Sequence, residues 1–144
     1  MHDTYMCHAN KRADTVSDSR ARPDSADPER VRRHLPVRPV EFQILLSLGR
    51  GPRHGYGVIL DADERTGGAF RLDVATLYRA LKRMERDGLV AEAEERPTGD
   101  DDARRRYYDL TPLGRAVAEA EARRLTALVR AARGADLLDG VEPA

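Results

Sequence analysis

The sequence predicts a mainly α-helical fold with one small β-hairpin, arranged as a winged helix-turn-helix followed by a long C-terminal dimerisation helix. Three observations support this fold class. Three short segments carry apolar residues at helical spacing, two strand-like segments flank a loop with Pro and Gly, and one long helical segment comes last. In such a fold one helix enters the DNA major groove and the hairpin lies on the flanking backbone. The chain has 144 residues, the length of one ordinary domain.

Residues 1–36 are expected to form a disordered N-terminal tail. They are rich in Asp, Arg, Ser and Ala and have few large apolar side chains, so burial cannot offset the entropy cost of ordering. Any helix in this region is interrupted by Pro23, Pro28 and Pro36. His2, Cys7 and His8 are close in sequence, but an unstructured tail explains them better than a metal site does. We therefore predict no metal.

The winged helix-turn-helix domain is expected over residues 37–110, and its first helix ends before Gly49. The apolar stripe of this helix has helical spacing and consists of Val40, Phe42, Ile44, Leu45, Leu46 and Leu48. The helix is ended by Gly49, Gly51 and Pro52, because glycine and proline in succession cannot continue it.

A second helix is expected over residues 54–65, ended by a pair of glycines. Gly55 and Gly57 in its first turn each cost about 1 kcal/mol relative to Ala. Close packing, or a close approach of the backbone to a phosphate, must compensate for that cost. Tyr56 is expected to pack in the core with its hydroxyl exposed. His54 has no partner pattern for catalysis or metal binding, and we expect a structural role for it.

The third helix follows a short extended stretch and is expected to run from its N-cap, Asp73, to about Asp87. Gly88 is suited to end it, because glycine adopts the left-handed conformation at helix ends. The expected buried face consists of Val74, Leu77, Leu81 and Met84.

A hairpin with a long tip is expected after the third helix. Residues 89–95 alternate between two faces and predict one strand, and residues 104–110 predict the second. The loop between them, residues 96–103, contains Pro97 and Gly99. The pair forms the wing of the predicted fold.

The last helix is expected over residues 111–134, with Thr111 as N-cap and Pro112 as the first helical residue. About 22 helical residues span about 33 Å, which is longer than the domain needs for its own closure. The helix carries an apolar seam of Leu113, Val117, Ala120, Leu125 and Leu128. A seam of this length favours a homodimer interface over packing on the chain's own domain. Residues 135–144 are expected to fray.

The third helix also carries candidate DNA contacts. Thr76 and Arg79 lie near its start, where side chains reach base edges, and the fork of an arginine suits guanine. Lys82 and Arg83 lie further along and suit phosphate contacts. The alternative is an ordinary solvated helix face, because the chain has 25 basic and 25 acidic residues and a net charge of +0.

Further candidates flank that helix. The hydroxyls of Tyr56 and Tyr78 can reach phosphates. Alternate residues of a strand face opposite ways, so Arg104 and Arg106 share one face of the wing and Arg105 takes the other. Acidic residues 100–102 at the wing tip can pair with these arginines or repel the DNA backbone.

Several other classes of protein are disfavoured. A single cysteine gives no disulfide framework, no apolar run approaches the length of a bilayer, and the N-terminus has no signal-peptide core. We therefore expect a cytoplasmic protein with no membrane partner. No nucleophile has a paired base and no Gly-rich phosphate loop occurs, although Ser47 and His54 are close in sequence. We predict that the protein is not an enzyme and needs no cofactor.

Residues 41–115 resemble the PadR family of transcriptional regulators. Five segments carry the resemblance in the family's order and spacing, namely Ile44–Leu48, Gly51–Tyr56, Ala75–Glu85, Asp87–Val90 and Arg105–Arg115. The resemblance implies a homodimeric winged helix protein that usually represses nearby genes and is sometimes released by a small-molecule effector. It also implies that the third helix, around residues 76–79, docks in the major groove. The chain departs from the family at Arg79, where proline is frequent, and in its acidic wing tip.

The sequence thus predicts a DNA-binding transcriptional regulator. We expect a repressor that binds double-stranded DNA as a homodimer, at a palindromic operator near its own gene. The alternative is a winged helix used for protein contacts without direct DNA binding, which the zero net charge and the acidic wing tip favour.

Overall fold

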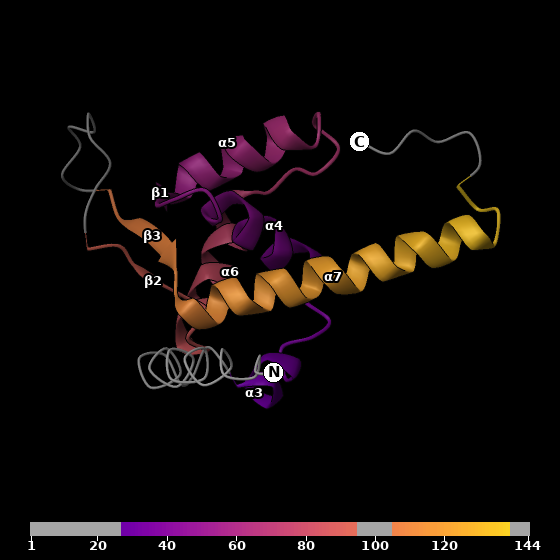
Figure 1. Cartoon of the computed structure of the whole chain (residues 1–144). Helices are drawn as coiled ribbons and strands as arrows, with labels where there is room; N and C mark the ends of the chain where they lie inside the picture. Colours follow the sequence, from indigo (N-terminus) through magenta and orange to yellow (C-terminus); the bar gives the residue numbers. More distant parts are fainter. Residues whose placement is uncertain (1–26, 95–104, 139–144) are drawn as a thin grey trace, which may run out of the picture.

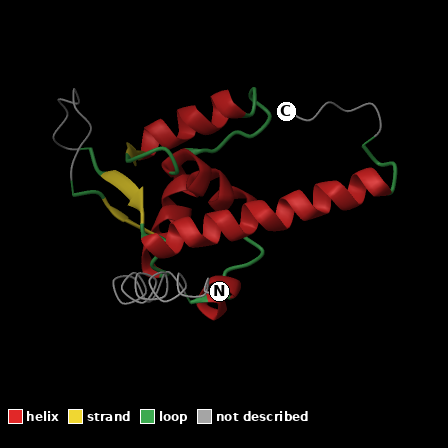
Figure 2. Cartoon of the chain, in the orientation of Figure 1, coloured by secondary structure: helices red, strands yellow, loops and turns green. Residues whose placement is uncertain are grey.

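A computed structural model describes residues 27–94 and 105–138 of the chain. Helices dominate this part, and a small sheet lies at one end of the helical body (Figures 1 and 2). The elements in chain order are α3 (Pro28–Arg32), α4 (Pro39–Leu48), β1 (Arg53–His54), α5 (Gly55–Arg65), α6 (Val74–Arg86), β2 (Val90–Glu92), β3 (Tyr107–Leu110) and α7 (Pro112–Gly134). The predicted fold class is confirmed, since α4, α5 and α6 precede the β2–β3 hairpin and α7 follows it.

The sheet has three antiparallel strands in the order β1-β3-β2. In the predicted hairpin, Val90 lies opposite Leu110 and Glu92 opposite Tyr108. The third strand, β1, was not predicted, because two residues are too short to show an alternating pattern. It pairs His54 with Tyr107 and thereby attaches the start of α5 to the wing.

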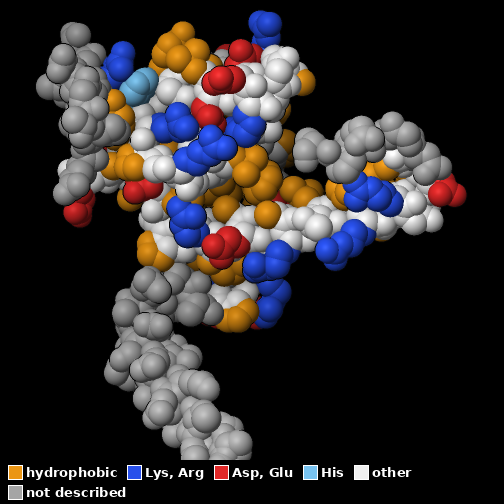
Figure 3. Space-filling model, turned by 45° about the horizontal axis from the view of Figure 1, so that its top comes forward, with side chains coloured by type: hydrophobic (Ala, Val, Ile, Leu, Met, Phe, Trp, Pro, Cys, Tyr) orange, Lys and Arg blue, Asp and Glu red, His pale blue; other side chains and the backbone are white. Residues whose placement is uncertain are grey.

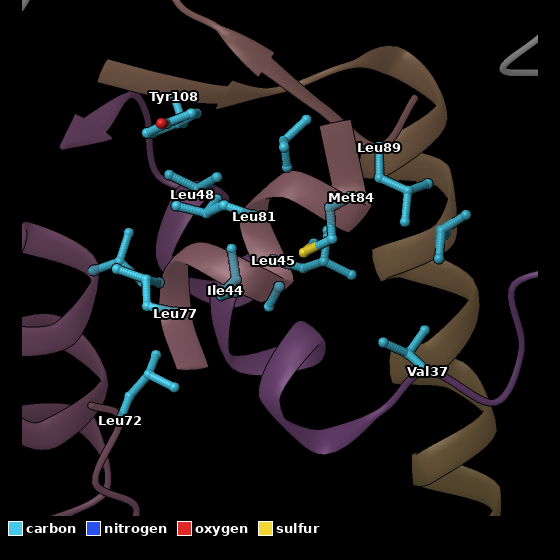
Figure 4. Close-up of a cluster of buried hydrophobic side chains, with 14 of the residues drawn as sticks. Val37, Ile44, Leu45, Leu48, Leu72, Leu77, Leu81, Met84, Leu89 and Tyr108 are labelled. Carbon is cyan, nitrogen blue, oxygen red and sulfur yellow. The ribbon is translucent and has the colours of Figure 1, made fainter. Parts of the chain in front are cut away.

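The core lies between α4, α6 and the first half of α7. Figure 4 shows the side chains of α4 (Ile44, Leu45 and Leu48) among those of α6 (Leu77, Leu81 and Met84). All six are at most 1% exposed. Full burial of one such side chain contributes about 1.5–3 kcal/mol, so this cluster supplies much of the driving force for folding.

One residue of the predicted buried face of α6 lies outside the core. Val74 is 57% exposed, and Ala80, which is 1% exposed, takes the buried place instead. Val74 is the first residue of the helix, directly after its cap, and lies before the turn at which α6 packs. The prediction for Val74 was therefore wrong, whereas those for Leu77, Leu81 and Met84 are confirmed.

The predicted helix ends are formed by local hydrogen bonds. The carboxylate of Asp73 accepts a hydrogen bond from the Thr76 backbone N–H at 2.8 Å. The hydroxyl of Thr111 accepts one from the Gly114 N–H at 2.9 Å. Gly88 has a φ of 81° and ends α6 as expected.

Part of the expected N-terminal tail is helical. Residues 27–36 belong to the expected tail, yet they contain α3, which is capped by Asp27. Val31 and Leu35 pack against the core, and Val37 is itself buried. The prediction of disorder was wrong for this segment, because its few apolar residues are covered by other elements rather than by one another. Residues 1–26, with the candidate metal ligands His2, Cys7 and His8, lie outside the described part.

Helix α7 extends well beyond the body of the domain (Figure 1). Its first half is part of the core, since Leu113 is 4% and Val117 0% exposed. The prediction that these two residues face a second chain was therefore wrong. Ala120 and Leu125 are half-buried, and Leu128 is 53% exposed. Residues 139–144 of the expected frayed end lie outside the described part.

Gly114 fixes the position at which α7 meets the domain. A Cβ placed on this residue would lie 1.9 Å from the carbonyl oxygen of Leu89. No other amino acid fits there without displacing the backbone between α6 and β2. Nearby, the Thr111 hydroxyl donates to the carbonyl of Gly88 at 2.6 Å, so two contacts hold the start of α7 against this turn.

Candidate nucleic-acid interface

The outward side of α6 presents the predicted base-contacting residues. Arg79 is exposed, and its guanidinium lies 3.4 Å from the hydroxyl of Thr76. That hydroxyl donates in turn to the carboxylate of Asp73 at 3.0 Å. The two hydrogen bonds from Thr76 hold the pKa of Asp73 below its usual value. Thr76 is therefore oriented by the helix cap and places its side chain next to Arg79.

The two predicted phosphate contacts of α6 have different surroundings. Lys82 is exposed and makes no ion pair within residues 27–94 and 105–138. Arg83 turns toward α4, where its Nε donates to the carboxylate of Glu41 at 2.6 Å. This geometry does not support a phosphate contact for Arg83, because the guanidinium neutralises a half-buried acid. Sequence spacing could not reveal the pair, since its members are 42 positions apart.

Tyr56 and Tyr78 lie close together at the surface, on α5 and α6. Tyr56 is 57% exposed, so the expectation that it packs in the core was wrong; Val58 and Ala62 take the buried positions of α5. Gly55 explains the approach of the two helices, because a Cβ there would lie 2.3 Å from the Tyr78 hydroxyl oxygen. Close packing, one of the two expected explanations, thus accounts for Gly55, but Gly57 has only ordinary contacts.

A hollow forms where α5, α6 and the wing meet. Its lining consists of His54, Gly55, Tyr56, Tyr78, Arg105, Arg106 and Tyr108. Three phenol rings and two guanidinium groups therefore surround one depression next to the outward side of α6. Cationic donors combined with tyrosine hydroxyls suit an oxyanion such as a phosphate.

The two described wing arginines are both held near this hollow. Arg106 donates a hydrogen bond to the side chain of Tyr108. Burial raises the pKa of the Tyr108 hydroxyl by more than that bond lowers it, so the ring stays neutral. Arg105 lies with its Nη1 at 3.0 Å from the Nε2 of His54. Arg104 and the acidic residues 100–102 lie outside the described part.

His54, Arg105, Tyr107 and Tyr108 were missed as parts of the site. His54 caps α5, because its Nδ1 accepts a hydrogen bond from the Gly57 N–H at 3.1 Å. Its ring meets that of Tyr107 edge to face, with the centroids 5.3 Å apart. The available signal was the position of His54, just before Gly55 and Gly57 at the start of the helix. Histidine at that place is neither an apolar core residue nor a common N-cap, so its presence there pointed to another role.

A polar network fastens α5 to α4 away from the hollow. The Ser47 hydroxyl donates to the carboxylate of Asp61 at 2.7 Å, and Arg65 donates to both. Burial alone would raise the pKa of Asp61, but the hydrogen bonds from Ser47 and Arg65 and the nearby charges lower it overall. Ser47 thus links Asp61 and Arg65 of α5 to α4, which gives it a structural role.

The charged side chains do not form one patch of a single sign on the face shown in Figure 3. Lys and Arg side chains lie next to acidic ones over the body of the domain, and more cations follow α7. Within the described residues no group of three His, Cys, Asp or Glu side chains could hold a metal ion. No helix among them is long and apolar enough to cross a membrane.

The chain is similar to known transcriptional regulators. The model of the transcriptional regulator PadR-like family matches residues 44–120. An uncharacterised protein in a transposon of Streptomyces fradiae is 36% identical over 88 residues, which are 61% of this chain. The match spans only 23% of that relative's own length.

Two solved structures share the fold. A PadR family transcription regulator from Clostridium difficile is 25% identical, with a TM-score of 0.55 over 66% of this chain and 95% of that one. A transcriptional regulator from Clostridium thermocellum is 21% identical, with a TM-score of 0.56 over 75% of this chain and 95% of that one. The second likeness shows the fold alone.

Proposed function

Because the chain belongs to the PadR-like family of transcriptional regulators, we propose that it binds double-stranded DNA through α6 and the hollow beside it. The observation that carries this proposal is the grouping of Arg79 and Lys82 on the outward side of α6, next to a hollow lined by tyrosines and arginines. Net charge does not carry it, because the chain has a formal charge of +0.

We assign some side chains of this surface to base contacts and others to phosphate contacts. Arg79, oriented beside Thr76, contacts base edges in the major groove, where an arginine fork matches guanine. Lys82 and the hydroxyls of Tyr56 and Tyr78 contact phosphates, together with the wing arginines Arg104 and Arg106. Arg83 is assigned instead to the packing of α6 on α4, through Glu41.

We further propose that the protein acts as a homodimer through the second half of α7. Leu128 and Val129 are exposed there, and Leu125 is half-buried beside them. A second copy of the chain presents the same apolar side chains, so a two-fold symmetric contact would bury both sets. Two α6 helices would then read two half-sites of a palindromic operator, and the dimer would repress genes near its own.

Fluorescence anisotropy with a labelled duplex from the region upstream of the gene tests DNA binding. Arg79→Ala should weaken binding by about 1–3 kcal/mol and reduce discrimination between sequences. Lys82→Ala should weaken binding to all sequences and lower the salt slope by about 0.9. The control is Arg123→Ala, which removes an exposed cation on α7 and should leave binding unchanged. Absence of specific binding by the folded wild-type dimer at every salt concentration would reject the proposal.

A winged helix that contacts proteins is the second candidate function. The exposed acids Glu92 and Glu94 on and after β2 favour it, because they would repel a DNA backbone lying along that strand. In cells, the double variant Arg79→Ala with Lys82→Ala decides between the two. Regulation that survives this change supports protein contact, whereas its loss supports DNA binding.

A further inference from the structure

The phenol ring of Tyr78 lies against the backbone of Gly55, the first residue of α5. A Cβ on Gly55 would lie 2.3 Å from the Tyr78 hydroxyl oxygen and 2.7 Å from Cζ of the same ring. Real Cβ atoms essentially never come within 3.0 Å of another heavy atom. The ring of Tyr78 therefore occupies the space that a side chain at position 55 would need, and glycine leaves that space open.

Tyr78 also lies where two hollows adjoin. The first is the hollow at the junction of α5, α6 and the wing, described above. The second lies between α6 and the wing, and it is lined by Tyr78, Leu81, Lys82, Glu85, Arg106 and Tyr108. Tyr78, Arg106 and Tyr108 line both, so a ligand that follows the boundary between α6 and the wing passes the Tyr78 hydroxyl.

The surroundings of the Tyr78 hydroxyl favour an anion. The side chain of Tyr78 is 45% exposed, and its hydroxyl has no hydrogen-bond partner within residues 27–94 and 105–138. Two cations, Lys82 and Arg106, line the second hollow against one carboxylate, that of Glu85. The local charge is therefore positive, although the net charge of the whole chain is +0.

We propose that Gly55 is a positioning residue for Tyr78, and that the hydroxyl it leaves in place donates a hydrogen bond to one backbone phosphate of the bound DNA. The inference rests on the proposed DNA binding and adds the residue that determines where this contact is made. A phosphate oxygen is a suitable acceptor, because a hydrogen bond to an ionised group is stronger than one between neutral groups. A ring already held by packing also loses little conformational entropy on binding.

Three variants separate the position of the ring from its hydroxyl. Gly55→Ala adds a methyl group that meets the far end of an exposed phenol, which can rotate away, and Leu77 Cδ2, at 3.2 Å, needs to move only slightly. The melting temperature should therefore stay within about 4 °C of the wild type. Tyr78→Phe keeps the ring and removes the hydroxyl. Gly57→Ala is the matched control, because it adds the same methyl to the same helix with no atom nearer than 3.5 Å.

Anisotropy with the upstream duplex gives the first test. Gly55→Ala and Tyr78→Phe should each weaken binding about fivefold, as expected for loss of one hydrogen bond, and Gly57→Ala should bind like the wild type. The variant with both Gly55→Ala and Tyr78→Phe should bind no more weakly than Tyr78→Phe alone, because Gly55 acts through the hydroxyl. Wild-type affinity for Gly55→Ala, an equal loss for Gly57→Ala, or losses that multiply in the double variant would overturn the inference while leaving DNA binding by the wild type intact.

Replacement of single phosphates shows whether the hydroxyl contacts the DNA backbone. Phosphates of the duplex are exchanged one at a time for uncharged methylphosphonates. At one position the exchange should cost the wild type about fivefold more affinity than it costs Gly55→Ala or Tyr78→Phe, because both variants have already lost that contact. At all other positions the cost should be the same for the three proteins. Equal costs at every position would overturn the phosphate contact.

The last test needs no DNA. In protein labelled at tyrosine, NMR should show nuclear Overhauser contacts between the ring protons of Tyr78 and the Hα protons of Gly55, with the ring signals identified by their loss in Tyr78→Phe. Gly55→Ala should remove these contacts, and Gly57→Ala should keep them. Their absence in the wild type, or their persistence in Gly55→Ala, would overturn the positioning role. If the wild type bound no DNA while the contacts behaved as expected, the proposed function would fail and the phosphate contact with it, but the packing of Tyr78 on Gly55 would stand.

Discussion

The two halves of α7 form one continuous helix but have opposite surroundings. In residues 112–121, Leu113, Gly114, Val117 and Glu121 are buried by the chain itself. In residues 122–134 no residue is fully buried, and Leu128 and Val129 are exposed. The first half completes the core of the domain, whereas the second half leaves apolar side chains exposed. One apolar stripe along a helix can therefore pack on the chain's own domain in its first half and be exposed in its second half. The spacing of the apolar residues does not show where the packed part ends.

The largest effect is expected for a substitution of Gly114, in the first half of α7. Gly114→Ala places a methyl group on the Leu89 carbonyl oxygen, so the backbone must shift, and we expect a loss of about 3 kcal/mol in the free energy of unfolding. Gly134→Ala is the matched control, because a Cβ there has nothing within 4 Å. Urea unfolding of both variants at one protein concentration measures the contrast. Equal effects at the two glycines would mean that the halves do not differ in this way.

Leu128 probes the exposed half. Leu128→Glu sets charges against each other in the proposed dimer and should raise its dissociation constant about 100-fold, or about 2.7 kcal/mol. Ala127→Glu adds the same charge on the exposed side of the helix away from the apolar surface and should change little. Sedimentation equilibrium gives the association state of both. Dimers that persist in Leu128→Glu would argue against an interface on this half.

Glu121 marks the boundary between the halves and makes it sensitive to pH. Two hydrogen bonds from Arg124, at 2.8 and 2.6 Å, lower the pKa of the Glu121 carboxyl; burial opposes this shift, and the Val37 N–H adds to it. A lowered folded-state pKa contributes stability that is fully present above the unfolded value, here 4.5, and is lost as the pH falls through the folded value. Acid should therefore loosen the contact between α7 and the segment before α4.

Glu121→Gln tests this pH dependence. The variant should cost about 2 kcal/mol at pH 7, because the buried carboxylate loses its charged hydrogen bonds with the partly exposed Arg124, and the cost should shrink below pH 4.5. Glu119→Gln, an exposed change on the same helix, serves as the control. Denaturant midpoints measured from pH 7 downward report both. A deficit that stays constant across this range would show that Glu121 does not titrate as described.

Local chemistry made parts of this fold predictable. Asp73 and Thr111 cap their helices with hydrogen bonds to residues three positions later, and Gly88 ends α6 with a positive φ. Each of these features depends on residues within one turn of the chain. The order of helices and the hairpin follow from the same short-range patterns.

Features that depend on distant partners were not predictable. The two residues of β1 become a strand only because β3 lies beside them. Arg83 resembles a phosphate contact until Glu41 is found next to it. Leu113 and Val117 have the spacing of a dimer seam, but the chain's own core covers them. In each case the residue type limits the role, and tertiary packing selects it.

The tight seat of Gly114 on the Leu89 carbonyl has a mechanical consequence. The start of α7 packs directly against the turn after α6, with no space for a side chain between them. A helix of 23 residues is about 34 Å long, so a rotation of about 5° displaces its far end by about 3 Å. In the proposed dimer α7 would thus act as a lever with its fulcrum at this glycine. A small change in how two such levers cross would alter the distance between the paired α6 helices, and with it the DNA spacing that the dimer can span.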